Sequence, residues 1–354
     1  VGALCERALV EPRVGGLERL THKAKLARLV LAMGAERGRA CRTPPTTLVH
    51  DLQGVAHAVE AAASGAGGGT EGGGRALWYL KQPGLQRGQG ITILSETAQA
   101  APVLMAAEES GEAAAGLVLQ RAVAPPALIN GRKFGLRVHL LLVLPPPAVA
   151  AEGGGSAGGG SAGGGDGGGS GGGVAAVAGR PLVAWVHGDA VLTMCGSAYD
   201  EARTDAMTHI TCTSVQRNAP GFERGKVKGA ASELWPDGWP DALRVVRSSL
   251  RALLEGLLDC GALREAMGTW PAGHVAYQCL GCDFVVDAAG APWLLELNEA
   301  PQYGDPLAMD GLRRALGQPL LNHLPEAIAR SQLPPGAGAD SAAADGECGG
   351  WQRL

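Results

Sequence analysis

Two carboxylates and an amide lie on neighbouring predicted strands in the last quarter of the sequence. Glu296 and Asn298 stand two apart in the apolar run PWLLELN, and side chains two apart in a strand share a face. The preceding run, HVAYQCLGCDFVVD, reaches this strand through the short turn DAAGA. An antiparallel register with Asp283 across from Leu294 puts Asp283 diagonal to Glu296, roughly 7–8 Å apart between Cα atoms.

The chemistry that this group supports is the binding of a hard cation. Two carboxylates and an amide oxygen, with room for water, suit Mg²⁺ better than zinc. On the opposite side, we expect Leu295 and Leu297 to hold the strand in the core. The alternative is a water-facing side of an edge strand, which alternation alone would also produce.

Cations on two other predicted strands favour a binding site. Lys81 ends the run ALWYLK, directly before a loop that contains Gly88 and Gly90. Glycine lets backbone N–H groups approach a phosphate closely, and a lysine adds positive charge. Lys133 and Arg137 stand four apart in the run KFGLRVHLLLVL and share a face, where burial is costly unless an anion meets them. The sequence therefore predicts that these basic residues bind a nucleotide phosphate beside the Mg²⁺ ion.

Hydrophobic periodicity predicts mixed helices and strands that would position these residues. Helical spacing or composition is found over residues 17–33, 51–63, 98–116, 241–258 and 309–333. Strand-like runs are found over residues 44–49, 75–96 (two strands that flank a glycine loop), 116–123, 134–144, 181–187, 274–287 and 292–298. We also expect His209, in THITCTSVQRN, to be a hydrogen-bonded core histidine in a strand.

The composition excludes several classes of protein. The chain has 354 residues, of which 46% are hydrophobic and 18% charged, and its net charge is −4. No global positive field exists to hold nucleic acid, and no apolar run is long enough to span a membrane. Cys279 and Cys282 form one CLGC motif without a second cysteine pair, which favours two strand thiols over a zinc or redox site. We expect a cytoplasmic protein that binds neither nucleic acid nor membrane.

Segments rich in small residues mark the parts of the chain that we expect to be disordered. The glycine-serine run over residues 152–173 joins two predicted strands and cannot bury enough apolar area to fold. Residues 334–354 form a tail of small residues. The chain begins at Val1 and not at Met, so we expect an N-terminal portion to be missing.

Over about residues 17–303 the sequence resembles the tubulin-tyrosine-ligase-like family, which has the ATP-grasp fold. The matching segments are LTHKAKLARLV, WYLKQPGLQRGQGI, VLQRAVAPPALINGRKFGLRVHLLLV, THITCTSVQ and GCDFVVDAAGAPWLLELNEAP. The resemblance implies an α+β fold in which two mixed or antiparallel sheets with flanking helices enclose a nucleotide cleft. The implied domains are a partial N-terminal domain (1–63), a central subdomain (75–128) and a C-terminal subdomain (129–332), followed by the tail.

The family resemblance also implies an activity. Such a protein uses ATP and Mg²⁺ to add an amino acid (Glu, Tyr or Gly) to tubulin or another protein through an acyl phosphate. The implied nucleotide-binding residues are Lys23, Lys81, Gly88, Gly90, Gln120 and Lys133, with Gln120 near the adenine. The implied catalytic residues are Lys133 and Arg137, facing the γ-phosphate and the acyl phosphate, and the implied metal ligands are Asp283, Glu296 and Asn298.

Three residues depart from the family pattern on the substrate side. Thr193 stands where the family usually has Arg, Gly135 where it has Asp, and Cys212 where it has Asn. The missing Arg would help to hold the carboxylate of the incoming amino acid or the intermediate. An alternative function is therefore a catalytically weak nucleotide-binding relative that acts as a microtubule- or protein-binding module.

The expected partners are a free amino acid and tubulin or another protein acceptor. The run FERGKVKG, with Arg224, Lys226 and Lys228, could meet acidic tubulin tails, although a run of charges is more often a solvated face. We expect a cytoplasmic monomer that associates with the cytoskeleton or the cilium.

Overall fold

The computed structural model describes most of the chain, with gaps. The described residues are 10–11, 18–64, 76–144, 174–177, 180–219, 222–263, 275–299, 318–331 and 347–354. The glycine-serine run predicted to be disordered (152–173) lies outside them, as do residues 334–346 of the predicted tail. None of the described helices has the length and apolar character needed to cross a membrane.

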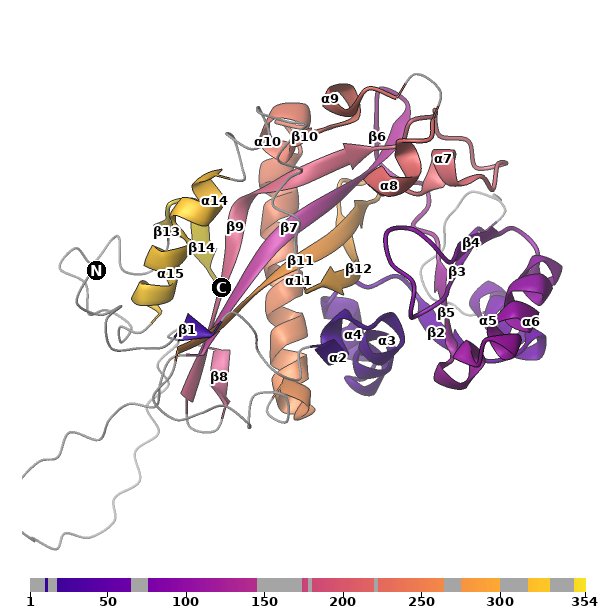
Figure 1. Cartoon of the computed structure of the whole chain (residues 1–354), viewed down its shortest axis with the longest axis horizontal. Helices are drawn as coiled ribbons and strands as arrows, with labels where there is room; N and C mark the ends of the chain where they lie inside the picture. Colours follow the sequence, from indigo (N-terminus) through magenta and orange to yellow (C-terminus); the bar gives the residue numbers. More distant parts are fainter. Residues whose placement is uncertain are drawn as a thin grey trace, which may run out of the picture.

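A large sheet of ten strands forms the centre of the molecule (Figure 1). Its main path runs β1–β11–β7–β9–β14–β13, while β12 pairs with β11, β6 with β7, and β8 and β10 with β9. All pairings are antiparallel except that of β1 with β11. The strands are β1 (Val10–Glu11), β6 (Leu128–Ile129), β7 (Arg132–Leu144), β8 (Val174–Val177), β9 (Arg180–Met194), β10 (Lys228–Ala230), β11 (Val275–Val286), β12 (Pro292–Asn298), β13 (Glu347–Cys348) and β14 (Trp351–Arg353).

The long helix α11 (Trp239–Asp259) covers one face of this sheet. Along β7, the even-numbered side chains from Phe134 to Leu144 join Val246, Leu250 and other side chains of α11 in the largest hydrophobic cluster. Apolar residues recur at helical spacing in α11, and the strand alternates, so each element has one face for this core. The odd-numbered side chains of β7 consequently point to the opposite face of the sheet.

The opposite face is apolar at one end, where α14 (Gln318–Asn322) and α15 (Leu324–Arg330) cover it. Leu141 and Val143 of β7 meet Leu320, Ile328 and Trp351 there. Trp351 belongs to β14, which pairs with β9, and it is fully buried. The expectation of a disordered tail is therefore wrong for residues 347–354, because the buried Trp351 and the strand pairing hold them on the sheet.

A second sheet of four antiparallel strands runs in the order β2–β5–β3–β4 (Figure 1). One face packs against α5 and α6 through side chains such as Leu80, Leu119 and Leu104. The other face carries Tyr79, Lys81, Val118 and Gln120, which alternate with the packed side chains. The elements are β2 (Thr46–Val49), β3 (Trp78–Lys81), β4 (Ile91–Leu94), β5 (Leu117–Arg121), α5 (Leu52–Ser64), η1 (Thr97–Ala100), α6 (Ala101–Glu109) and η2 (Glu112–Ala115).

Short helices connect the two sheets. Ala24 and Ala27 of α3 pack on Val118 of the small sheet, while Leu26 of the same helix joins the core of the large sheet. Ile210 and the partly buried Val215, near α7 and α8, pack on Ile93 of β4. The remaining helices are α2 (Glu18–Thr21), α3 (Lys23–Ala32), α4 (Ala35–Ala40), α7 (Ala206–His209), α8 (Thr213–Gln216), α9 (Arg224–Val227) and α10 (Ala231–Leu234).

These mixed helices and antiparallel sheets confirm the predicted α+β class. The helix expected over residues 17–33 is divided into α2 and α3, because His22 caps the second helix by accepting a hydrogen bond from the Lys25 amide. His209 ends helix α7 and does not lie in a strand, so that expectation is wrong. Cys279 and Cys282 belong to separate hydrophobic clusters on opposite faces of β11, so the two thiols cannot form a common site.

Candidate functional site

The predicted polar residues of the large sheet lie in one row across three strands. Arg137 of β7 is directly opposite Asp283 of β11, and Asp283 is directly opposite Glu296 of β12. Side chains of directly opposed residues in an antiparallel pair share a face. The row lies on the odd-numbered face of β7, away from α11.

The register assumed from the sequence for β12 is wrong. Leu294 pairs with Phe284 and Glu296 with Asp283, because the pairing shifts between Asp283 and Phe284. One extra residue on β12 fits a β-bulge at Leu295. The bulge lets Leu294 and Leu297, and not Leu295, enter the core with α11, and it brings Glu296 beside Asp283 where simple alternation gave only a diagonal contact.

Asp283 and Arg137 form a two-point ion pair. Arg137 donates from Nε and Nη2 to the two oxygens of Asp283, each at 2.7 Å. The Asp283 carboxylate raises the pKa of Arg137, so the guanidinium stays charged. Burial raises the pKa of Asp283 despite the opposing effect of Arg137. This pair holds both side chains in a fixed orientation at the centre of the row.

Oxygen atoms suited to a hard cation gather next to this pair. Asn298 donates to Asp283 at 3.1 Å, and its amide also bonds to the Glu296 carboxylate. Among the described residues, no group of three or more His, Cys, Asp or Glu side chains could hold a metal ion. The donor set is therefore two carboxylates, one already shared with Arg137, and one amide. Such a set fits a Mg²⁺ ion that keeps several waters and phosphate oxygens as its other ligands.

Glu296 lies within the field of three cations. Burial alone would raise the pKa of its carboxyl, but Lys81, Lys23 and Arg137 outweigh burial, so the pKa is lowered. Lys23 Nζ lies 3.8 Å from Glu296 Oε2. These cations come from β3, α3 and β7, so the site is assembled from both sheets and the helix between them.

Lys81 and Lys133 are the two most deeply buried of the site cations. Burial lowers the pKa of the Lys81 amine to about 8, and Lys23 and Lys133 add to this effect while Glu296 opposes it. The amine donates to Gln120 Oε1 at 2.7 Å, and Gln120 Nε2 donates to Thr46 Oγ1 at 3.1 Å. Thr46 in turn donates to the carbonyl of Pro44 at 2.7 Å. This chain of hydrogen bonds across β3, β5 and β2 fixes where the charge of Lys81 lies.

Lys133 reaches across from the large sheet to the small one. It donates to the hydroxyl of Tyr79 at 2.8 Å, and its amine lies 5.1 Å from the centre of the Tyr79 ring. His209 lies close by: burial lowers its pKa, the charge of Lys133 adds to this, and its Nε2 lies 2.7 Å from the carbonyl oxygen of Arg203. His209 is thus a hydrogen-bonded core residue, as the sequence indicated.

The glycine loop between β3 and β4 folds toward the large sheet. Gly88 and Gly90 have φ angles of 78° and 65°, which favour glycine. A Cβ atom on Gly88 would lie 2.7 Å from Val215 Cγ2. Lys23 Nζ donates to the carbonyl of Leu85 at 2.6 Å and so ties the loop to α3. Hydrogen bonds, ion pairs and electrostatic effects therefore connect eight of the ten predicted site residues, and Gly88 and Gly90 belong to the loop that Lys23 ties to α3.

The three departures from the family pattern adjoin one another. Gly135 pairs directly with Thr193, and a Cβ atom on Gly135 would lie 2.5 Å from Thr211 Oγ1. The Thr211 hydroxyl thus occupies the space that a larger residue at position 135 would need. Cys212 follows Thr211, acts electrostatically on Arg137, and lies below the glycine loop, 3.3 Å from where a Gly88 Cβ would be.

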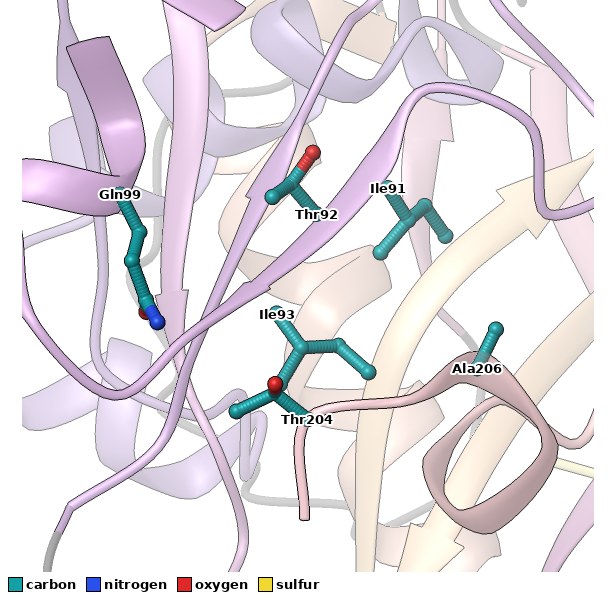
Figure 2. Close-up of a pocket in the computed structure, with 6 residues that line it drawn as sticks. All are labelled: Ile91, Thr92, Ile93, Gln99, Thr204 and Ala206. Carbon is teal, nitrogen blue, oxygen red and sulfur yellow. The ribbon is translucent and has the colours of Figure 1, made fainter. Parts of the chain in front are cut away.

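An open pocket of about 370 Å³ lies at the outer strand of the small sheet. Figure 2 shows Ile91 and Ile93 of β4 facing Thr204 and Ala206, with Thr92 and Gln99 completing the lining. Its lining is half polar and half apolar and contains none of the cations or carboxylates described above.

Sequence reasoning missed two residues that form hydrogen bonds with predicted site residues. Tyr79 accepts a hydrogen bond from Lys133. Thr46 accepts one from Gln120, which itself accepts one from Lys81. Tyr79 stands two before Lys81 in one strand, so shared-face periodicity could have pointed to it. The position of Thr46 depends on the pairing of β2 with β5, which no local pattern reveals.

The chain is similar in sequence to one protein family and to two individual relatives. Residues 19–145 match the model of the tubulin-tyrosine ligase family. The chain is 23% identical over 215 residues to tubulin polyglutamylase ttll-5 of Caenorhabditis elegans, covering 55% of this chain and 24% of that protein. It is 22% identical over 233 residues to the probable tubulin polyglutamylase ttll-9 of the same organism, covering 64% of this chain and 46% of that protein. The chain thus spans less than half the length of either relative. Together, the family match and these relatives show that the chain is similar to tubulin-tyrosine-ligase-like proteins.

Proposed function

We propose that the chain is an ATP-dependent carboxylate–amine ligase that adds an amino acid to tubulin. One observation carries this proposal: Lys81 is a buried cation close enough to Lys23, Lys133 and Glu296 for their charges to shift its pKa. A buried amine whose pKa is lowered to about 8 by burial and by like charges suits an anionic ligand, because the ligand would relieve that repulsion. The names of the two relatives favour glutamate over tyrosine or glycine as the added amino acid.

In this proposal the cations bind the phosphates of ATP. Lys23 and Lys81 would contact the phosphates beneath the loop of Gly88 and Gly90, and Gln120 would hold Lys81 on the adenine side. Asp283, Glu296 and Asn298 would hold Mg²⁺, which neutralises phosphate charge when bound. Each of these groups is already oriented by a neighbour, as the hydrogen bonds of Lys81 and the Arg137–Asp283 pair illustrate.

The reaction would proceed in two displacements. An acceptor carboxylate oxygen bonds to the γ-phosphorus as ADP departs, and the amine of the amino acid then displaces phosphate from the acyl carbon. Lys133 and Arg137 would face the transferring phosphoryl group and stabilise its charge. Their positions on one face of β7, with Arg137 fixed by Asp283, support this role.

A second candidate is a catalytically weak nucleotide-binding relative that acts as a microtubule- or protein-binding module in the cytoplasm. The observation in its favour is that the paired residues Thr193 and Gly135 carry no charge, although the family pattern has charged residues at both positions. The ATP and metal groups would be the same in both candidates, so nucleotide binding alone does not separate them.

Incorporation of labelled amino acids separates the two candidates. The purified chain is incubated with Mg-ATP, tubulin and labelled Glu, Tyr or Gly, and radioactivity in tubulin is measured. The ligase proposal predicts ATP-dependent incorporation that Glu296→Gln reduces by about 100-fold or more, while Glu255→Gln, on the exposed side of α11, leaves it unchanged. Nucleotide binding without incorporation of any of the three would favour the binding module.

A further inference from the structure

A hydrogen bond joins the small sheet to the large sheet at one of the basic residues of the site. Lys133 belongs to β7 of the large sheet, and Tyr79 belongs to β3 of the small sheet. The Lys133 amine donates to the Tyr79 hydroxyl at 2.8 Å and lies 5.1 Å from the centre of the ring. The position of this amine therefore depends on a side chain from the other sheet.

The surroundings of Lys133 give its amine little else to hold it. The residue is buried, and among the described residues no carboxylate forms an ion pair with it. The charge of Lys133 helps to lower the pKa of Lys81 and of His209, so these basic groups lie close together. A lysine has a long, flexible side chain. Repulsion from Lys81 would therefore turn the amine away unless another group held it.

Tyr79 has two features that attract an ammonium group. Its hydroxyl oxygen accepts a hydrogen bond, and its ring face attracts a cation. The residue itself is fixed, because its backbone lies between Ile93 and Gln120 on the two neighbouring strands. Its ring packs, partly buried, against the cluster of Leu77, Ile93 and Ile210. Tyr79 is thus a rigid acceptor and not a mobile surface side chain.

The same strand also carries Lys81. Tyr79 stands two residues before Lys81 in β3, and the two side chains share a face. Strand β3 therefore places one cation directly and the other through Tyr79. The separation of the two amines is set by a single strand, even though Lys133 comes from the other sheet.

We propose that Tyr79 is a positioning residue that holds the Lys133 amine beside Lys81 before a nucleotide binds. A cation that is already in place need not reorganise when charge moves during phosphoryl transfer. This consequence for the reaction rests on the proposed ligase function. The holding of the amine does not depend on that function, so it can be tested in the nucleotide-free protein.

The reactivity of the Lys133 amine tests the holding directly. Nucleotide-free protein is treated briefly with acetic anhydride, and acetylation of each lysine is measured by mass spectrometry. Tyr79→Phe keeps the ring and removes the hydroxyl, so acetylation of Lys133 should become about 5-fold faster or more, with the exposed Lys25 as the unchanged internal reference. Tyr277→Phe, at the apolar end of β11, is the matched control. An unchanged rate at Lys133 in Tyr79→Phe would overturn the proposal.

Steady-state kinetics test the consequence for the reaction. Tyr79→Phe should lower kcat for amino-acid incorporation about 10-fold, with the KM values for ATP and tubulin within about twofold of wild type. If Tyr79 acts through Lys133, then Tyr79→Phe should cause no further fall in kcat when Lys133→Met is already present. Tyr277→Phe should leave kcat unchanged. A merely structural role would instead lower kcat by the same factor in both backgrounds.

The outcomes separate this inference from the proposed function. Equal falls in kcat in the two backgrounds overturn the positioning role, and so does an unchanged kcat in Tyr79→Phe. A wild type that incorporates no amino acid overturns the ligase function, while the acetylation of Lys133 still decides whether Tyr79 holds its amine. Thermal unfolding checks that Tyr79→Phe folds, and Tyr79→Met replaces it in both assays if it does not.

Discussion

The two ends of β7 and β11 share one face of the large sheet but differ in chemistry. At one end, Leu141 and Val143 lie beneath α15 and Trp351 in a closed apolar cluster. At the other end, Arg137 and Asp283 form an ion pair on a face with no cover from α14 or α15. The backbone pairing is continuous between the two ends, so the strands themselves do not explain the contrast.

The difference lies in what covers each end. The apolar end is covered by segments from the end of the chain, which can exclude water completely because they bring Leu320, Ile328 and Trp351. The polar end faces the small sheet, which presents Lys81 and Tyr79. One strand face can thus form core at one end and carry charged groups at the other when different segments cover its two halves.

The largest expected effect is on the stability of the apolar end. Trp351→Ala removes a fully buried indole and should lower the free energy of unfolding by about 3–5 kcal/mol. Denaturant unfolding measures this, and Leu321→Ala, 45% exposed on α14, should change it by less than about 1 kcal/mol. Loss of Mg-ATP affinity in Trp351→Ala under conditions where it is folded would contradict the independence of the two ends.

The polar end should make the free energy of unfolding depend on pH, and the apolar end should not. Lys81 has a pKa of about 8 when folded and an ordinary value of 10.5, so the unfolded chain binds more protons between these values. Stability should therefore rise with pH across this window, by about 3 kcal/mol relative to Lys81→Met. Chemical denaturation of both proteins at pH 7 to 10.5 measures the difference. The same change of stability with pH in both proteins would contradict the lowered pKa of Lys81.

Breaking the Arg137–Asp283 ion pair should lower stability, and a second substitution should restore most of that loss. Arg137→Met leaves the Asp283 carboxylate in its partly buried position without its cation, which should lower the free energy of unfolding by about 1–3 kcal/mol. Asp283→Asn in the same chain should recover most of that loss, because no unpaired charge remains. A double-mutant cycle measures the coupling, and strictly additive losses would show that the pair contributes no coupling to stability.

The smallest expected effect concerns the hydrogen bonds that hold Lys81. Thr46→Val removes the hydroxyl that accepts from Gln120 and should weaken Mg-ATP binding about 3- to 10-fold, with about 1 kcal/mol lost in stability. Thr47→Val, the next residue on β2, points to the other face and is the matched control. Equal effects of the two substitutions on Mg-ATP affinity would contradict a positioning role for Thr46.

Much of the polar end could be predicted from the sequence because it depends on local alternation. The spacing of Lys133 and Arg137 places them on one face of β7, and that of Glu296 and Asn298 does the same on β12. The register of β12 could not be predicted, because the bulge at Leu295 changes the pairing without changing the apolar pattern.

The apolar end was harder to predict because its cover comes from distant sequence. The segment ECGGWQRL forms β13 and β14 around Gly349 and Gly350, whose φ angles are 54° and 87°. A glycine pair between two short runs indicates a hairpin, but the small residues of the tail as a whole suggested disorder instead. The pairing of β14 with β9, across more than a hundred residues, has no local signature.

The most direct test of a nucleotide site at the polar end is the affinity of wild type and of Lys81→Met for Mg-ATP, measured by isothermal titration at pH 7. The account predicts that wild type binds and that Lys81→Met loses about 10-fold or more in affinity, while Lys25→Met, exposed on the same molecule, binds as wild type does. Equal affinity in wild type and Lys81→Met, or no binding by wild type, would contradict a nucleotide site at the polar end.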